Sequence, residues 1–395
     1  MNLPLYQQLR QGASAPVPLR RALWRLVGPD RARYLNGQVT NDVSRLNLGK
    51  SIYAAVTSAK GRMVGDIFIG AAPDALYVDA ALELRETLAP RLEKYLIADD
   101  AAWEDLTDEW TLTHVFGAEA PVLPEPESPA AAVPPRGRAV ESASRESVID
   151  TINARDLPPP ADGALPPDPA LQVYGDGQDA EDEAYADQPT AANIPHVLAN
   201  ARFGLKGWDI WQPANAGANP SPDALSLSLA ISEPVPADII ETLCVEHGLA
   251  QWGVDMDEAN LPPESLLEQR SISYSKGCYV GQEIIARLKS VGQVNKRLCV
   301  LRPVEAICGE EDVTKHGSLE SAINAAKAVL AGATLSVGDR DVGRITSAAY
   351  SPEAGRILCL GYVNRMVGTD ATIASSAGAA YSFTITSPLL TVAKI

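Results

Sequence analysis

Four short apolar runs near the N-terminus predict β-strands. Each is rich in β-branched and apolar residues, and glycine, proline or polar turn residues close it. The runs are ALWRLVG at 22–28, SIYAAVTS at 51–58, MVGDIFIG at 63–70 and ALYVDA at 75–80. Segment 85–100 instead repeats apolar residues at helical spacing, through Leu88, Leu92 and Leu96. Strands interleaved with a helix predict an α+β part over residues 1–116.

The segment 117–192 differs sharply in composition from the rest of the chain. Prolines crowd together there with alanine and acidic residues, including EDE at 181–183. Proline at that density breaks both helices and ladders, and the few large apolar residues cannot offset the entropy of ordering. We therefore expect a mobile or irregular insertion or linker. It is either a plain spacer or an acidic docking segment for a basic partner.

Regular patterns resume after this insertion and predict a second α+β part over residues 193–295. The expected elements are a strand at 224–232, a helix at 236–253, a strand at 271–275 and a helix at 281–292. From Lys296 onward the chain reads mostly as strands, at 296–303, 333–338, 341–351, 357–363 and 381–387, with one helix at 318–330. Residues 296–395 are therefore expected to form a C-terminal β-barrel or sandwich.

Charge and cysteine content narrow the possible functions. The formal net charge of −17 and a pI of about 4.7 argue against a surface that holds nucleic acid directly. Five cysteines form a sparse set with neither a CxxC pair nor histidines at zinc spacing, so we expect reduced thiols and no metal site. No uncharged apolar run reaches membrane-spanning length, and no signal or transit pattern is recognised. The expected location is the cytoplasm.

The octapeptide KGCYVGQE at 276–283 places Cys278 close to the predicted start of a helix. The positive end of the helix dipole, together with Lys276 if it lies on the same side, would favour thiolate over thiol. A small buried thiol is the alternative. The window 270–302 also contains seven cations against one acid, Glu283, which suggests either a local anion site or a solvated basic face. Its cations are Arg270, Lys276, Arg287, Lys289, Lys296, Arg297 and Arg302.

The same octapeptide resembles the signature of the folate-binding YgfZ family, which is related to the glycine-cleavage T-protein, an aminomethyltransferase. Further stretches resemble other parts of that family's sequence, so the resemblance covers nearly the whole chain except the insertion. They are GPDRARYLNGQVTNDV at 28–43, SAKGRMVGDIFI at 58–69, LPPESLLEQ at 261–269 and VGRITSAAYSPEAGRILCLGYVNR at 342–365.

The resemblance implies an aminomethyltransferase-like fold, with ferredoxin-like α+β units and a C-terminal barrel around a central folate pocket. It implies tetrahydrofolate or another reduced folate as the cofactor. It also implies a role in the assembly or maintenance of iron–sulfur proteins, with an indirect effect on tRNA modification. The partners would then be iron–sulfur assembly machinery or its client proteins.

A reduced folate needs hydrogen-bonding groups for its pterin, an apolar slot and cations for its glutamate tail. We expect Asp66, a carboxylate within the apolar strand at 63–70, to face that pocket. The other expected folate contacts are Asn36, Gln38, Asn41, Asp42, Lys60, Arg62, Gln251, Tyr279 and Arg287. Asn and Asp are also common in turns and caps, and Tyr279 could simply pack in the core. The signature residues Gly277, Gly281, Gln282 and Glu283 are expected to have structural roles.

One departure from the family bears on activity. Aminomethyltransferases carry an Arg-x-Glu-x-Gly pattern before the signature region, whereas this chain has LAQWGVD, with Leu249 and Gln251 in the places of the arginine and the glutamate. An amide can bond a pterin but cannot balance charge as a carboxylate does. Aminomethyl transfer is thereby disfavoured.

Three functions compete. In the favoured one, the chain is a folate-binding iron–sulfur maturation factor in which Cys278 reacts as a thiolate tuned by Lys276. In the second, it is a folate-dependent aminomethyl or methylene transferase, with Asp66 orienting the amine. The third, a cysteine hydrolase, would need a histidine base. The four histidines, His114, His196, His247 and His316, lie in no recognisable catalytic context.

Overall fold

The computed structural model describes residues 1–121, 195–214, 229–290, 292–305, 314–369, 371–376, 381–389 and 391–393. Most of the predicted insertion at 117–192, and part of the predicted strand at 224–232, lie outside these residues. Those two predictions therefore stay untested. Within the described ranges, no helix is both long and apolar enough to cross a membrane.

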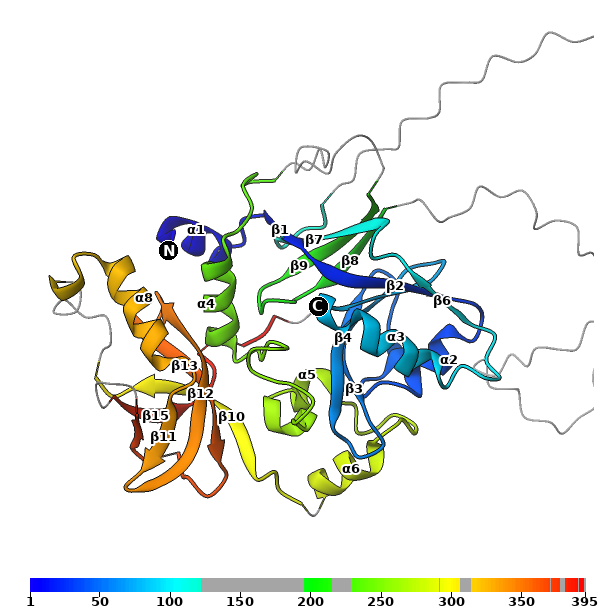
Figure 1. The fold of residues 1–395 in the computed structure, drawn as a ribbon. Coiled ribbons are helices and arrows are strands. Elements are labelled where there is room, and N and C mark those ends of the chain that lie inside the picture. The colour runs from blue at the N-terminus through cyan, green and yellow to red at the C-terminus, as the bar shows by residue number, and fades with distance from the viewer. Residues whose placement is uncertain are drawn as a thin grey trace, which may run out of the picture. The chain divides into compact units, whose positions relative to one another are not determined.

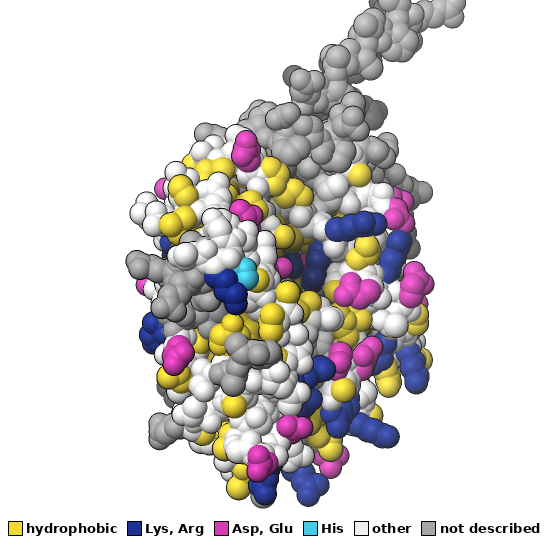
Figure 2. All heavy atoms as spheres, turned by 60° about the vertical axis from the view of Figure 1, so that its left-hand side comes forward, with side chains coloured by type: hydrophobic (Ala, Val, Ile, Leu, Met, Phe, Trp, Pro, Cys, Tyr) yellow, Lys and Arg dark blue, Asp and Glu magenta, His cyan; other side chains and the backbone are white. Residues whose placement is uncertain are grey.

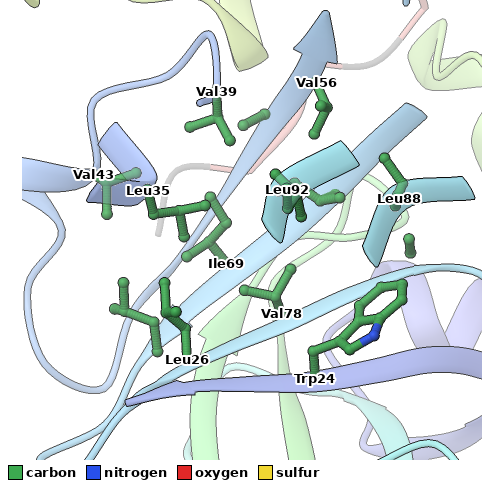
Figure 3. Packing of buried hydrophobic residues seen from close by; sticks show 14 of the residues in the cluster. Trp24, Leu26, Leu35, Val39, Val43, Val56, Ile69, Val78, Leu88 and Leu92 are labelled. Atoms are coloured by element: carbon green, nitrogen blue, oxygen red, sulfur yellow. The ribbon is translucent and has the colours of Figure 1, made fainter. Parts of the chain in front are cut away.

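A five-stranded antiparallel sheet confirms the four strands predicted near the N-terminus. Its strands, in spatial order, are β3 (Ser51–Thr57), β4 (Met63–Ala71), β5 (Leu76–Ala81), β2 (Arg21–Val27) and β6 (Ala102–Asp105). Helices α2 (Arg31–Asn36) and α3 (Arg85–Glu93) cover one face. Figure 3 shows Leu35 of α2 and Leu88 and Leu92 of α3 pointing at Ile69 and Val78 of the sheet. The second sheet covers part of the opposite face, through Leu23 and Tyr77. Tyr53, Asp66 and Phe68 on the same face line a cavity.

A second antiparallel sheet takes strands from both sides of the predicted insertion. Its strands, in spatial order, are β1 (Ala15–Leu19), β7 (Trp110–Phe116), β9 (Gly207–Pro213) and β8 (His196–Asn200). The two α+β parts predicted at 1–116 and 193–295 therefore share this sheet. The sequence did not reveal β1 because Pro16 and Pro18 interrupt its apolar pattern.

The helices differ in length from the predicted ones. Helix α4 (Ala237–His247) ends at Gly248, whose φ of +66° is left-handed, five residues before the predicted glycine stop at Gly253. Helix α3 ends at Glu93, short of residue 100, and contains Pro90. The remaining helical elements are α1 (Leu3–Arg10), α5 (Glu268–Ser271), α6 (Gln282–Ser290), and the short 3₁₀ turns at Val43–Arg45, Leu82–Leu84 and Pro262–Ser265.

The predicted strand at 271–275 is wrong. Ser271 ends α5, and the following residues form a bend. Ile272 is buried and Tyr274 exposed in a loop that makes one described backbone–backbone hydrogen bond to the N-terminal part, from Ser273 N to Thr40 O, and accepts another at the Ser271 carbonyl from the Thr40 hydroxyl. A single backbone–backbone hydrogen bond does not make a ladder.

The C-terminal part is a closed six-stranded barrel, as predicted (Figure 1). Its strands, in order round the barrel, are β10 (Lys296–Pro303), β13 (Arg356–Asn364), β12 (Arg340–Ser351), β11 (Thr334–Val337), β14 (Ile373–Ser375) and β15 (Ser382–Thr386). Helix α8 (Leu319–Leu330) packs on β12 and β13. The barrel has its own core, and an outer strip of it packs on α4 and on the turn Pro262–Ser265, in a cluster that extends to Tyr53, Met63 and Phe68 of the first sheet.

Candidate functional site

A cavity of about 560 Å³ lies where the face of the first sheet opposite α2 and α3 meets β1 and the start of α4. We call it the Asp66 cavity. Its volume is in the range of small-molecule sites. It has an apolar wall and a polar wall, and Figure 2 shows a hollow in which charged side chains are set back among hydrophobic ones. The polar wall comprises Arg21, Tyr53, Asp66, Arg202, Glu241, Gln251 and Arg270.

Asp66 is the most unusual group in this wall. Its position on β4 turns the side chain into the cavity, where only 6% of the residue is exposed. Oδ2 accepts a hydrogen bond of 3.0 Å from the Tyr53 hydroxyl, whereas Oδ1 is buried without a partner among the described residues. Burial raises the pKa of this carboxyl, and the charge of Arg21 opposes that shift. An unpartnered buried carboxylate oxygen calls for a ligand that donates a hydrogen bond.

Arg270 provides a cation on the same wall. Its guanidinium carbon lies 5.1 Å from the ring centroid of Tyr53, and that ring lies 4.7 Å from the ring of Phe68. Within the described ranges, the Arg270 guanidinium has no carboxylate partner, and burial lowers its pKa. Tyr53, Phe68 and Arg270 also line a second pocket, of about 260 Å³. These three side chains thus stand between two hollows.

A buried ion network fixes the remaining part of the polar wall. Arg202 donates two hydrogen bonds to Asp79, of 2.9 and 2.7 Å, and one of 2.7 Å to Asp209. Burial opposes the charge on Arg202, but Asp209 and Asp79 outweigh it and raise its pKa. Its guanidinium carbon lies 3.9 Å from the Phe68 ring centroid. Arg202 therefore bridges two carboxylates, which Arg21 and His114 also contact, and it supports the aromatic pair. It is less available to a ligand than Arg270.

Gln251 also lines the cavity, as the pterin contact predicted from the sequence would require. Its amide nitrogen donates to Cys244 Sγ at 3.3 Å and to the Leu249 carbonyl at 3.4 Å. The amide oxygen is then left as an acceptor. Unlike the glutamate that it replaces, it brings no charge to the site.

The signature loop, residues 276–283, is built on a buried lysine. Lys276 Nζ donates to the carbonyls of Asn36, Val39 and Asn41 at 2.6, 2.8 and 2.7 Å. All three ammonium donors are thus used by the loop that follows α2. Burial lowers the pKa of Lys276 to about 8. Lys276 anchors the signature loop, and its ammonium is committed to these carbonyls.

Contacts at the other end of the signature loop complete the anchor. Thr57 Oγ1 donates to the Val280 carbonyl at 2.5 Å, and Val280 N donates to the Gly37 carbonyl at 3.2 Å. Gly281 has a φ of +87°, and a Cβ there would lie 2.5 Å from the Ser58 carbonyl oxygen. Tyr279 is buried, whereas Cys278 between these anchors is exposed. The loop therefore presents the thiol to solvent on a fixed backbone.

The structure gives most of the other predicted folate contacts different surroundings. Asn36 Oδ1 accepts from Val43 N, Gln38 Oε1 from Arg91, and Asp42 Oδ1 from Ser44 N. Lys60, Arg62 and Arg287 are exposed, and Arg62 donates to the Ala259 carbonyl. Asn41 lines the second pocket and bonds the carbonyls of Tyr53 and Arg270 at 2.8 and 3.0 Å. Of the predicted ligand contacts, the described structure brings Asp66 and Gln251 together in the cavity.

The remaining signature residues lie around the start of α6. Gly277 is exposed, and a Cβ there would meet nothing within 4 Å. Gln282 and Glu283 occupy the first turn of α6, and the Gln282 amide reaches the Gly277 carbonyl at 3.4 Å. This arrangement fits the structural roles expected for Gln282 and Glu283.

Sequence reasoning did not identify Tyr53, Arg202 and Arg270 as cavity residues. Arg270 was counted only as part of a basic window, and the structure disperses that window: Lys276 is caged by carbonyls, and Lys296 lies 4.7 Å from the Tyr362 ring centroid. In the sequence, Arg202 lies seven residues before Asp209, in a stretch for which no element is predicted, and its other partner Asp79 is 123 residues away. This spacing gives no signal without the sheet order.

Comparisons with known proteins agree with this architecture. Residues 296–390 match the family model described as the glycine cleavage T-protein C-terminal barrel domain. An aminomethyltransferase of Rubrobacter xylanophilus is 25% identical over 85% of this chain and 72% of its own length. An iron-sulfur cluster assembly factor IBA57 homolog of Phaeosphaeria nodorum is 24% identical over 73% of this chain and 55% of its own. The tRNA-modifying protein YgfZ of Cronobacter sakazakii is 25% identical over 72% of this chain and 71% of its own length.

The fold has a counterpart among solved structures. The glycine cleavage system aminomethyltransferase T from Bartonella henselae aligns with a TM-score of 0.62 at 14% identity, over 98% of this chain and 88% of that one. The shared fold includes the mixed helices and strands and the closed C-terminal barrel. Together with the YgfZ and IBA57 relatives, these matches show that the chain is similar to YgfZ and IBA57 proteins and, over residues 296–390, to the barrel domain of the glycine-cleavage T-protein.

Proposed function

We propose that this chain binds tetrahydrofolate or another reduced folate in the Asp66 cavity and acts in the assembly or maintenance of iron–sulfur proteins. An effect on tRNA modification would follow through iron–sulfur enzymes. The relatives named for iron–sulfur cluster assembly and for tRNA modification support this choice. Cys278 would serve as the reactive thiol, and the cavity would serve as the ligand site.

The observation that carries the folate proposal is the orphaned Oδ1 of Asp66. A pterin offers N–H donors that suit a carboxylate, and Arg270 supplies a cation for a carboxylate of the tail. Tyr53 and Phe68 give flat apolar surfaces for the aromatic rings of the ligand. The residues present therefore fit a reduced folate, which would supply the one-carbon carrier chemistry when bound.

Titration calorimetry with tetrahydrofolate tests the cavity. We expect the wild type to bind and Asp66→Asn to weaken binding by at least tenfold, because asparagine has one acceptor oxygen where aspartate has two. Glu241→Gln is the matched control, since Glu241 lines the same cavity but is paired with Lys327 at 2.5 Å. Equal affinities for the wild type and Asp66→Asn would refute the cavity assignment.

A second measurement tests the thiol. In cells that lack the chain, activity of an iron–sulfur enzyme should be restored by the wild type and not by Cys278→Ser. The same variant should bind tetrahydrofolate with unchanged affinity, because Cys278 is exposed on the signature loop and does not line the Asp66 cavity. Full rescue by Cys278→Ser would remove the thiol from the proposed function.

An aminomethyl or methylene transferase is the second candidate. The supporting observation is again Asp66, a buried carboxylate of raised pKa that could hold the N–H of a substrate amine. Turnover of an amine donor with tetrahydrofolate separates the two functions. We expect folate binding without turnover, since Gln251 replaces a charged residue of the transferases. Steady production of methylene-tetrahydrofolate that Asp66→Asn abolishes would favour the transferase.

A further inference from the structure

A second group of cations gathers in a pocket of about 450 Å³ between the end of α6 and the barrel. We call it the α6 pocket. Three of its cations are Lys289 of α6, Arg297 of β10 and Arg365, which follows β13. The one carboxylate among its described lining residues is Glu268. The pocket is therefore positively charged, in contrast to the chain as a whole.

The two arginines of this pocket are held in place by neutral acceptors. Arg297 donates to the carbonyls of Arg365 and Val367 at 3.2 and 3.0 Å, and Arg365 donates to Gln293 Oε1 at 2.6 Å. Neither arginine has an ion pair within the part of the chain that the structure describes. Both guanidinium groups are thus oriented by hydrogen bonds to neutral oxygens and have no carboxylate partner among the described residues. Arg365 is exposed and Arg297 half-buried, so an anion from solvent can reach both.

The lysine side of the pocket is already partly balanced. Lys289 Nζ lies 2.5 Å from Glu268 Oε1, which also accepts a hydrogen bond of 3.2 Å from the Tyr274 hydroxyl. The ammonium lies 5.1 Å from the Tyr274 ring centroid. Glu268 therefore offsets Lys289, and the net positive charge remains on Arg297 and Arg365.

We propose that the α6 pocket binds a phosphate-bearing ligand of mononucleotide size, with the phosphate on Arg297 and Arg365. Two guanidinium forks suit the charge and geometry of a phosphate dianion. Leu288 and Val294 provide apolar surface, and the half-exposed ring of Tyr274 provides a flat one for the remainder of the ligand. The volume is large enough for a whole small molecule.

Calorimetric titration of the full chain with adenosine monophosphate, in a buffer of low ionic strength, tests this proposal. We expect Arg365→Gln to weaken binding at least tenfold and Arg297→Gln to do the same. Arg302→Gln is the matched control, because Arg302 is exposed on the same strand as Arg297 and lies outside the pocket lining. It should bind like the wild type. Adenosine, which has no phosphate, should not bind.

Comparison ligands test which kind of anion the α6 pocket binds. Pyrophosphate should compete with adenosine monophosphate, whereas a dicarboxylate such as glutarate should not. Absence of adenosine monophosphate binding, or an equal loss in Arg302→Gln and Arg365→Gln, overturns the site. Binding of a short RNA without binding of the mononucleotide overturns the small-ligand assignment. Because the α6 pocket and the Asp66 cavity share no lining residue among those described, Arg365→Gln should leave tetrahydrofolate affinity unchanged.

Discussion

At the scale of single residues, burial of the Asp66 carboxylate lowers the stability of the fold and leaves an acceptor oxygen for the proposed ligand. Burial raises its pKa, so the folded chain holds the proton to a higher pH than the unfolded chain does. Ionised Asp66 therefore costs stability, and the cost grows as pH rises through the raised pKa. We expect Asp66→Asn to be more stable than the wild type at pH 7, by about 0.5–2 kcal/mol.

Urea unfolding at two pH values tests whether Asp66→Asn raises the free energy of unfolding, as expected. The advantage of Asp66→Asn over the wild type should shrink between pH 7 and pH 3.5, because the wild-type carboxyl then becomes protonated in both states. A variant that is less stable than the wild type at pH 7 would mean that the carboxylate is already satisfied in the free protein.

Lys276 is a second buried charge: its lowered pKa shows that burial works against the ammonium, but three carbonyls accept its hydrogen bonds. Replacing it by methionine leaves the carbonyls of Asn36, Val39 and Asn41 without their donor. We expect Lys276→Met to lower the free energy of unfolding by about 2–4 kcal/mol. Lys60→Met, at an exposed position, is the control and should change it by less than about 0.5 kcal/mol. Comparable urea midpoints for both variants would contradict the anchor.

The sequence could identify residues whose chemistry conflicts with their surroundings. Asp66 stands out because it is a carboxylate within an apolar run, and Cys278 because it lies within a specific octapeptide. Arg270 does not stand out, since a cation next to a polar segment looks like surface until the fold places its guanidinium over Tyr53. Residues whose role depends on partners far along the chain could not be found in this way.

At the scale of elements, the signature loop depends on one glycine more than on the other. Gly281 has a φ of +87°, and a Cβ at this position would lie only 2.5 Å from the Ser58 carbonyl oxygen. We expect Gly281→Ala to lower stability by about 1–3 kcal/mol. Gly277→Ala is the matched control, because a Cβ there meets nothing within 4 Å. Thermal unfolding compares the two, and an equal effect would show that the loop does not rest on the β3–β4 turn.

Elements with a strong local pattern were predictable, and those set by tertiary contacts were not. Most strands of the first sheet and of the barrel follow their apolar runs closely, but the short strands β6 and β14 were not predicted. Helix α4 ends at Gly248, which is left-handed and where a Cβ would lie 2.9 Å from Pro388; the sequence offers both Gly248 and Gly253 as stops, and the fold shows which one is used. The bend at 271–275 alternates serine with Ile272 and Tyr274, but Ile272 is buried and Tyr274 exposed, so the two do not share one buried face as they would in a strand.

At the scale of the whole described fold, Arg202 joins the two sheets. It bridges Asp79 of β5 and Asp209 of β9. Burial alone would raise the pKa of Asp209, but Arg202 and His114 outweigh burial and lower it. A carboxyl of lowered pKa adds stability at neutral pH that is lost as pH falls towards its folded pKa. We expect Arg202→Met to cost about 3–5 kcal/mol at pH 7, because it leaves buried carboxylates uncompensated.

Unfolding in urea at pH 7 and pH 4 tests this bridge. The difference in the free energy of unfolding between Arg202→Met and the wild type should be smaller at pH 4 than at pH 7. At pH 7, adding Asp209→Asn to Arg202→Met should restore part of the lost stability. A cost that is independent of pH and not rescued would point to lost packing on Phe68 instead of lost charge pairing.

The barrel closes on itself and has its own core, yet one strip of its outer surface is apolar. That strip consists of Leu298, Val300, Leu358, Leu360 and Tyr362, which belong to one core cluster with Val245 of α4 and with Met256 and Leu267. If residues 296–390 were produced alone, the strands could still pair round the ring, but this strip would meet water. We expect such a fragment to fold and then to self-associate, so that its solubility, more than its secondary structure, would report the loss of its neighbours.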